Sequence, residues 1–385
     1  MAQDPKYRVA LIGGGRAGPS RAAAFDAHPL CKVVAVADTD PENLALTAGR
    51  FGAAAYDTFD DMFANEQLDI VLPILPVRPN ADAVVAAAEA GAKAIFCEKP
   101  LTASLADADR MVEACASRGI PLGCGVMVSS HPDYRKAYRF AADGTIGQVG
   151  RINLYGSNNQ GGCHGMNLVR KFADKVAIEE VIGRVSGDPH SDHEEPYDDA
   201  ETGFGDVGGY IRFANGIEAF LSLGDFGVRG IEVIGSRGMI VNCDNTGLGL
   251  QLRIAPEADR TYLAEMEPVD VGFEPRPEPG AVRGRDASGW MDPGAPMLAI
   301  VDDIMRVLEE GGGELEITTG DDLRHALEMS IAVRESARRG HAPVTVPLED
   351  RSLTMYPQRS RWHYKKPILG EEAYMNALAQ QKIDT

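Results

Sequence analysis

The sequence lacks any apolar run approaching the roughly 20 residues that a helix needs to cross a bilayer. Residues 1–5 carry no basic segment followed by an apolar one, so we expect no secretory signal and a cytoplasmic protein. The cysteines show no C-x-x-C pair and no zinc-like spacing. They lie at positions 31, 97, 115, 124, 163 and 243. We therefore expect reduced thiols and no metal site.

Basic residues are also scarce. The chain has 38 lysines and arginines but 57 aspartates and glutamates, so its formal net charge is −19. Nucleic acids and anionic membranes both need a basic surface, so this balance argues against either partner. The hydrophobic fraction of 44% and the charged fraction of 25% are those of an ordinary soluble globular protein. A chain of 385 residues is too long for one core of ordinary size, and we expect two domains.

A glycine-rich turn follows the first β-prone run, residues 7–12. An alanine-rich, helix-prone segment, 19–27, comes next, and a second apolar strand, 33–37, ends on Asp38. Strand, G-x-G-x-x-G turn, helix, strand and terminal acid are the context of a dinucleotide-binding fingerprint, in which the pyrophosphate sits on the helix N-terminus. The turn residues predicted to contact the cofactor are Gly13, Gly15, Arg16, Ala17 and Gly18.

Asp38 also predicts which dinucleotide binds. A carboxylate at this position accepts hydrogen bonds from ribose hydroxyls and repels a 2′-phosphate. Thr39 follows, and no adjacent arginine is present to neutralise a phosphate. We expect NAD, with NADP less favoured.

The alternation of strands and helices continues beyond Asp38. The expected strands are 68–72, 94–97 and 122–128, and the expected helices are 41–51, 81–90 and 105–118. Between them, the proline-rich segment 73–80 is predicted to leave the sheet as a loop. This pattern is typical of a doubly wound α/β domain with a parallel sheet.

The strand predicted at 94–97 ends on Glu98-Lys99-Pro100. In an open α/β sheet, ligands bind outside the carboxyl ends of the strands, so Lys99 is expected to face the ligand. Pro100 has a fixed φ and restricts the residue before it, which stiffens the backbone at Lys99. Taken alone, a lysine beside a glutamate at a strand end is more often a solvated surface pair.

These features together resemble the Gfo/Idh/MocA oxidoreductases, a family named for glucose–fructose oxidoreductase, inositol dehydrogenase and a rhizopine-catabolism protein. The glycine turn, the strand-end aspartate, a loop at 76–80 and the Glu-Lys-Pro tripeptide occur in the family's order and spacing. The loop departs from the usual Pro-Asn-x-x-His, because Val77 follows Pro76 and Asn80 replaces the histidine. The resemblance implies further cofactor contacts from Pro76, Asn80, Glu98 and Lys99.

A second stretch, 160–172, resembles the family's D-x-G-x-H-x-x-D segment, which opens a helix over the nicotinamide. His164 falls on the family's histidine and Gly162 on its glycine, whereas Gln160 and Asn167 replace the two aspartates. Both carboxylates have thus become amides. The catalytic residues that the resemblance implies are Lys99, His164 and Gln160. The substrate contacts that it implies are Lys99, Gln160, His164 and Asn167.

The remainder of the chain predicts a second domain built on an antiparallel sheet. The expected strands are 149–155, 210–213, 217–223, 231–234, 239–241 and 249–254, and the expected helices are 131–142, 296–309 and 321–338. Asn215-Gly216 is a strong hairpin signal between two of these strands. The apolar face of such a sheet must be buried against other elements of the chain. In family members the opposite face commonly packs against another subunit, so the resemblance implies a homodimer or homotetramer.

Three further segments leave alternatives open. Residues 188–201 gather acidic side chains and histidines that could ligate a metal or carry acid–base chemistry, but a solvated acidic loop is the preferred interpretation. The Pro- and Gly-rich segment 267–296 is expected to be a loop, in which Trp290 either stacks on a sugar ring or pins the loop down. The basic, aromatic stretch 359–366 is interpreted as an intersubunit arm.

We therefore expect an α/β protein with an N-terminal Rossmann domain, a doubly wound parallel sheet, and a C-terminal α+β domain with an open, mostly antiparallel sheet. The predicted boundaries are 1–128 for NAD binding, 129–350 for substrate binding and oligomerisation, and 351–385 for a tail. Helices within 296–339 are expected to pack back on the first domain.

The resemblance implies an NAD-dependent dehydrogenase acting on a hydroxyl of a sugar, cyclitol or related polyol. Two alternatives stay open. One is an enzyme that uses tightly held NAD in a closed redox cycle, as some family glycosidases do. The other is a non-catalytic NAD- and sugar-binding sensor, against which the presence of both Lys99 and His164 argues.

Overall fold

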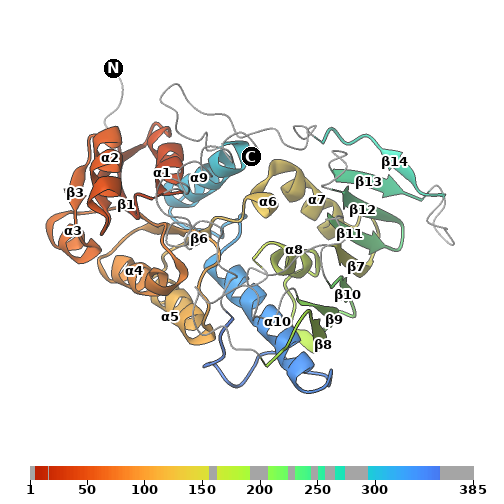
Figure 1. Cartoon of the computed structure of the whole chain (residues 1–385). Coiled ribbons are helices and arrows are strands. Elements are labelled where there is room, and N and C mark those ends of the chain that lie inside the picture. The colour runs from red at the N-terminus through yellow and green to blue at the C-terminus, as the bar shows by residue number, and fades with distance from the viewer. Residues whose placement is uncertain are drawn as a thin grey trace, which may run out of the picture. The chain divides into compact units, whose positions relative to one another are not determined.

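The chain forms two units, each with its own sheet (Figure 1). Unit 1 comprises Met1–Pro132 and Arg283–Arg324, and unit 2 comprises Asp133–Val282 and His325–Thr385. The computed structural model describes residues 5–15, 17–155, 163–190, 207–223, 230–243, 250–255, 265–273 and 294–355. The predicted fold class, a parallel Rossmann sheet plus a mostly antiparallel sheet, is confirmed.

Unit 1 is built on a sheet of six parallel strands in the order β3-β2-β1-β4-β5-β6. The strands are β1 (Tyr7–Ile12), β2 (Cys31–Ala37), β3 (Ala54–Tyr56), β4 (Ile70–Pro73), β5 (Ala94–Cys97) and β6 (Leu122–Cys124). The helices are α1 (Gly18–Asp26), α2 (Pro41–Phe51), α3 (Phe59–Asn65), α4 (Val77–Glu89), α5 (Leu105–Ala116), α6 (Met127–Ser130) and α9 (Gly294–Glu309). Because β1 lies between β2 and β4, the strand order reverses there, and such a reversal opens a ligand crevice at the carboxyl ends of the strands.

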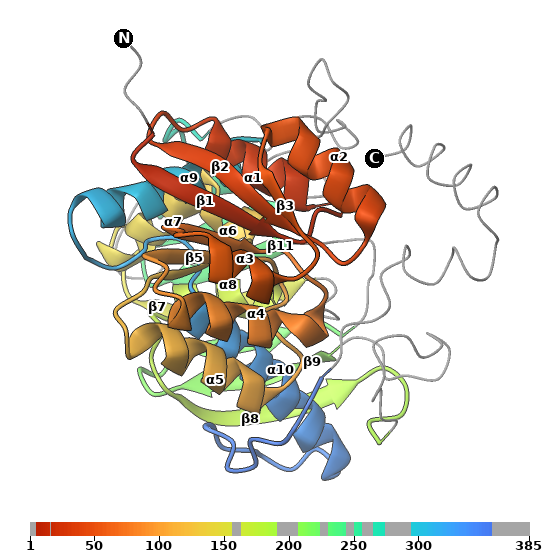
Figure 2. The ribbon, with the colours of Figure 1, turned by 90° about the vertical axis from the view of Figure 1, so that its left-hand side faces the viewer.

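The core of unit 1 buries every residue of the central strands β4 and β5. Helices α2 and α3 pack beside β2 and β3 (Figure 2), and α1 packs on β1. The rings of Phe25 in α1 and Phe96 in β5 lie 5.9 Å apart. Helix α9, distant in sequence, adds Met297 and Ile300 to the same buried cluster. Strands covered on both faces are continuous apolar runs, as β4 and β5 are.

Local signals place α2 where the sequence predicted it. Asp40 caps the helix, since its side chain accepts hydrogen bonds from the backbone N–H groups of Glu42 and Asn43 at 2.9 and 3.0 Å. Gly52 ends it in the left-handed conformation, with φ of 63°.

Two predictions for unit 1 are wrong in detail. The segment 76–80 is the first turn of α4 and not a loop, because Pro79 falls in the first turn, where a missing N–H costs nothing. The strand expected at 122–128 ends at Cys124, and α6 follows it. Strand β3 and helix α3 were not predicted.

Unit 2 is built on eight strands in the order β14-β13-β12-β11-β7-β10-β9-β8. All neighbours pair antiparallel except β7 and β10, which are parallel. The strands are β7 (Val149–Tyr155), β8 (Ile178–Val185), β9 (Val207–Phe213), β10 (Glu218–Leu221), β11 (Gly230–Gly235), β12 (Gly238–Cys243), β13 (Leu250–Ile254) and β14 (Glu267–Val269). The helices are α7 (Pro132–Ala142), α8 (Gly165–Phe172) and α10 (Gly320–Arg338), and the division between the units falls within α10.

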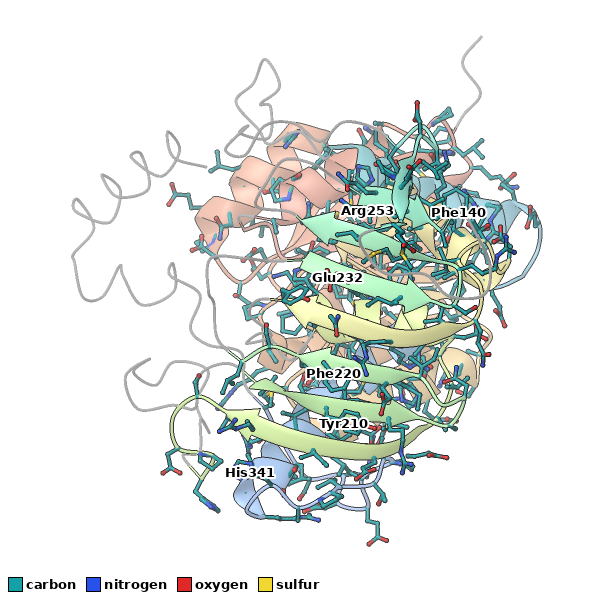
Figure 3. The ribbon with its side chains drawn as sticks, turned by 90° about the vertical axis from the view of Figure 1, so that its right-hand side faces the viewer. Phe140, Tyr210, Phe220, Glu232, Arg253 and His341 are labelled. Atoms are coloured by element: carbon teal, nitrogen blue, oxygen red, sulfur yellow. The ribbon has the colours of Figure 1, made fainter. Side chains whose placement is uncertain are left out.

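The two faces of this sheet differ in chemistry. One face buries Ile152, Ala219 and Val233. The other face is aromatic and charged, and Figure 3 looks onto it. Four side chains labelled there, on β9, β10, β11 and β13, are Tyr210, Phe220, Glu232 and Arg253. We call this second face the outer face.

Unit 2 agrees with the sequence predictions in part. The Asn215-Gly216 hairpin is confirmed, since β9 and β10 pair around it. Strand β8 was not predicted, and β14 occupies the start of the segment 267–296 that was expected to be a loop. Trp290, residues 191–201 of the acidic segment and the stretch 359–366 lie outside the described residues.

The thiols of cysteines 31, 97, 115, 124 and 163 are buried and form no disulfide. Burial raises the pKa of Cys31 and of Cys115 to about 12. In the described ranges, no group of three or more His, Cys, Asp or Glu side chains could hold a metal ion. Within the same ranges, no helix combines the length and apolar character of a membrane span.

Helix α10 packs closely against strand β8 at Gly183. A Cβ at Gly183 would lie 2.0 Å from the backbone oxygen of Val333, whereas a Cβ at Gly150, on β7, meets nothing within 4 Å. We expect Gly183→Ala to lower the free energy of unfolding by about 1–3 kcal/mol, the usual cost of overpacking. Gly150→Ala is the control and should be neutral or slightly stabilising. Urea unfolding measures both, and equal stabilities would contradict the close packing.

Candidate active site

The glycine turn between β1 and α1 is tightly packed at Gly13 and Gly18 and uncrowded at Gly15. Gly13 has φ of +98°, and a Cβ there would lie 2.4 Å from the backbone oxygen of Ile74. A Cβ at Gly18 would lie 1.9 Å from the backbone oxygen of Gly13. At Gly15, by contrast, the nearest atom to a Cβ is 3.9 Å away. The turn is therefore pressed onto the end of β4 and leaves its backbone accessible near Gly15, as a pyrophosphate site requires.

Of the two remaining residues predicted to contact the cofactor, Ala17 and Arg16, the structure describes only Ala17. Ala17 is the residue before α1 and is half-buried. Arg16 lies outside the described residues. Pro19 follows within the first turn of α1, where proline is well tolerated.

Asp38 follows the last residue of β2 and binds the glycine turn. Its Oδ2 accepts a hydrogen bond from the backbone N–H of Gly14 at 2.6 Å, and its Oδ1 accepts one from Asp40 at 2.8 Å. A carboxylate offers about four acceptor positions. Since the backbone occupies two of them, the half-buried side chain retains capacity for two hydroxyl donors, which fits an adenosine ribose.

The Glu98-Lys99-Pro100 tripeptide lies at the end of β5. Glu98 is buried and paired with Arg21 of α1, whose Nε donates to Glu98 Oε1. The other oxygen, Oε2, accepts the backbone N–H of Lys99 at 3.2 Å. Lys99 itself is half-buried, and its peptide bond to Pro100 is cis. The side chain of Glu98 is therefore turned toward the protein and fixes the backbone of Lys99.

Asn80 and Pro76 stand at the start of α4. Asn80 is buried, and its Nδ2 donates to the backbone oxygen of Leu101 at 2.8 Å. Its Oδ1 has no hydrogen-bond partner within the part of the chain that the structure describes. Pro76 is the exposed residue before the helix. Asn80 thus supports the segment that follows Lys99.

The second group of predicted site residues belongs to unit 2. His164 is half-buried and immediately precedes α8, and its backbone oxygen accepts from the N–H of Leu168 at 3.1 Å. Asn167 is fully buried in the first turn of α8. Gln160 and Gly162 lie outside the described residues.

Within unit 1, the structure gathers the ends of β1, β2 and β5 and the start of α4 at one edge of the sheet. Sequence reasoning missed two residues of this edge, Arg21 and Gly125. A charged residue in an otherwise alanine-rich helix is the only signal that could have marked Arg21.

Comparison with known proteins supports an NAD-binding Rossmann fold in the first part of the chain. Residues 7–126 match the model of an oxidoreductase family with an NAD-binding Rossmann fold. The chain is 35% identical over 142 residues to inositol 2-dehydrogenase 3 of Saccharopolyspora erythraea, which covers 36% of this chain and 42% of that protein. It is 29% identical over 140 residues to 2,7-anhydro-N-acetylneuraminate hydratase of Mediterraneibacter gnavus, covering 36% of this chain and 37% of that protein.

A solved structure of levoglucosan dehydrogenase in complex with NADH shares the fold, with a TM-score of 0.68 and 22% identity. The similarity covers 89% of this chain and 99% of that one. The matches to the two sequence relatives span less than half the length of either relative. Residues 7–126 thus match the Gfo/Idh/MocA oxidoreductase model, which confirms the resemblance drawn from the motifs.

Gly18 offers the sharpest test of the glycine turn as a cofactor site. We expect Gly18→Ala to weaken NADH binding by about tenfold or more, because a Cβ displaces the backbone of Gly13. Gly49→Ala is the matched control, since a Cβ at this position in α2 meets nothing within 4 Å. Titration of NADH fluorescence gives both dissociation constants. Unchanged binding in Gly18→Ala would place the cofactor elsewhere.

Proposed function

We propose that the protein is an NAD-dependent oxidoreductase that acts on a hydroxyl or keto carbon of a sugar, cyclitol or related polyol. The observation that carries this proposal is the placement of Lys99 at the end of β5, on the sheet edge that also holds Asp38 and the glycine turn. The names of its relatives, an inositol dehydrogenase and a levoglucosan dehydrogenase among them, support the substrate class. Unit 2 is proposed to supply the substrate contacts.

In the proposed reaction, the Lys99 ammonium donates a hydrogen bond to the substrate oxygen and stabilises negative charge as it develops there. His164 takes the proton of the hydroxyl during oxidation and returns it during reduction. Gln160 would hold the imidazole of His164 or bind a neighbouring hydroxyl. A bound nicotinamide supplies the hydride acceptor or donor.

NAD is the cofactor we propose, in preference to NADP. Asp38 follows β2 and keeps acceptor capacity for ribose hydroxyls. Asp40 and Glu42 follow closely in sequence, so a 2′-phosphate would meet negative charge, and no basic residue is adjacent to Asp38 in sequence.

The outer face of the unit 2 sheet is proposed to pack against another copy of the chain. Two of its aromatic residues, Tyr155 and Phe220, are 37% and 39% exposed. The guanidinium of Arg151 lies 4.7 Å from the ring centroid of Phe220, and the hydroxyl of Tyr155 donates to Glu232 at 2.7 Å. Aromatic residues and arginine are enriched at protein interfaces. A nucleic acid is not expected to bind so acidic a chain.

A closed redox cycle with tightly held NAD is a second candidate, favoured by the relative named as a hydratase. Addition of water changes no net oxidation state, so such an enzyme would regenerate its cofactor in each turnover. NAD that remains bound through extensive dialysis would support this candidate over the dehydrogenase.

The first test is NADH absorbance after the protein is mixed with NAD and a panel of monosaccharides, inositols and sugar acids. Turnover with any member would establish the dehydrogenase and begin to define its substrate. Silence across the panel, in a protein that binds NAD, would contradict the dehydrogenase and favour the closed cycle.

Lys99→Met tests the proposed role of the amine. We expect turnover to fall by about 100-fold or more, as when a stabilising donor is removed, with little change in NADH affinity. Lys93→Met is the control, because Lys93 is 60% exposed and pairs with Asp69 at 2.8 Å on the surface of the same unit. If Lys99→Met keeps most of the activity, Lys99 is not the catalytic amine.

A further inference from the structure

We propose that Arg21 is a positioning residue that holds Lys99 in place through Glu98, an inference that rests on the proposed function of Lys99. Arg21 stands in α1, three residues after Gly18. Its guanidinium donates to one oxygen of Glu98, and the other oxygen accepts the backbone N–H of Lys99. An unbroken chain of interactions therefore runs from the glycine-turn helix to Lys99, and its two charged side chains, Arg21 and Glu98, lie 77 positions apart in sequence.

The pair is buried, which makes each partner depend on the other. The side chains of Arg21 and Glu98 are 9% and 11% exposed. Removing one partner of a buried ion pair leaves an uncompensated charge in a medium that solvates it poorly. Without Arg21, the Glu98 carboxylate would have to take up a proton or turn toward water, and either change alters its bond to Lys99.

The space around Glu98 is matched to this geometry. A Cβ at Gly125, just after β6, would lie 2.8 Å from Glu98 Oε1. The backbone N–H of Gly125 donates to the oxygen of Cys97 at 2.9 Å. Glycine at this position thus leaves room for the carboxylate and also ties down the last residue of β5.

The backbone around Lys99 is held on both sides by these contacts. Gly125 holds Cys97, Glu98 holds the N–H of Lys99, and Asn80 holds the oxygen of Leu101. Of these three supports, only Glu98 links Lys99 to α1, the helix that begins at the glycine turn, and it does so through Arg21. A misplacement of about 1 Å in a reacting group can cost about 100-fold in rate, so this link has a direct kinetic consequence.

The test compares Arg21→Met, which removes the charge and the donors, with Arg21→Lys, which keeps the charge. Arg110→Met is the matched control, since Arg110 is 49% exposed on α5 and pairs with Asp82. With the panel sugar or inositol that the wild type oxidises, we expect Arg21→Met to lower kcat by about 10- to 100-fold while KM for NAD changes little. Arg21→Lys should recover part of kcat.

Amide hydrogen exchange gives a second readout that needs no substrate. In Arg21→Met, exchange at the Lys99 N–H should accelerate by about tenfold or more, as for the loss of a hydrogen bond, while amides of β1 keep their wild-type rates. Since exchange is measured whether or not the wild type turns over, failure of the proposed function can be told apart from failure of this inference.

Two results would overturn the inference. Unchanged exchange at Lys99 in Arg21→Met would show that Glu98 holds the backbone without the guanidinium. Equal acceleration across β1 and Lys99 would show that Arg21 supports the whole unit and positions nothing in particular.

Discussion

The backbone oxygen of Gly13 occupies the place where residue 18 would carry a Cβ, and the unit 1 site depends on this close approach. It presses the end of β1 against the start of α1. From that junction Gly14 reaches Asp38, which follows β2, and α1 carries Arg21 to Glu98, which follows β5. The parallel sheet places the ribose acceptor and the lysine-bearing strand end at one edge, and the junction of Gly13 and Gly18 is linked to both.

Much of this edge could be predicted from the sequence, because its signals are local. The glycine spacing, Asp38 after an apolar strand and Lys99 before a proline are all read within short windows. Helix α2 was predicted with its observed bounds because Asp40 caps it and Gly52 ends it. Strands as short as β3 and β14, three residues each, carry too little periodicity to be recognised.

Long-range pairing is the part that the sequence could not supply. The carboxylate of Glu98 pairs with Arg21, and no local pattern links two residues 77 positions apart. The contact of Glu98 with the cofactor stays a prediction. The proline-rich segment before Asn80 was predicted as a loop because proline disfavours regular structure, and its tolerance in the first turn of α4 decided otherwise. The catalytic roles of Lys99 and His164 remain proposals, with one residue in each unit.

The most direct test of the account is the affinity of the wild-type protein for the two reduced dinucleotides. Fluorescence titration with NADH and with NADPH at one ionic strength gives both dissociation constants. The account predicts that NADH binds more tightly by about tenfold or more, because Asp38 accepts from ribose hydroxyls and repels a 2′-phosphate. Tighter binding of NADPH, or no binding of either, would contradict the cofactor site on which the proposed function rests.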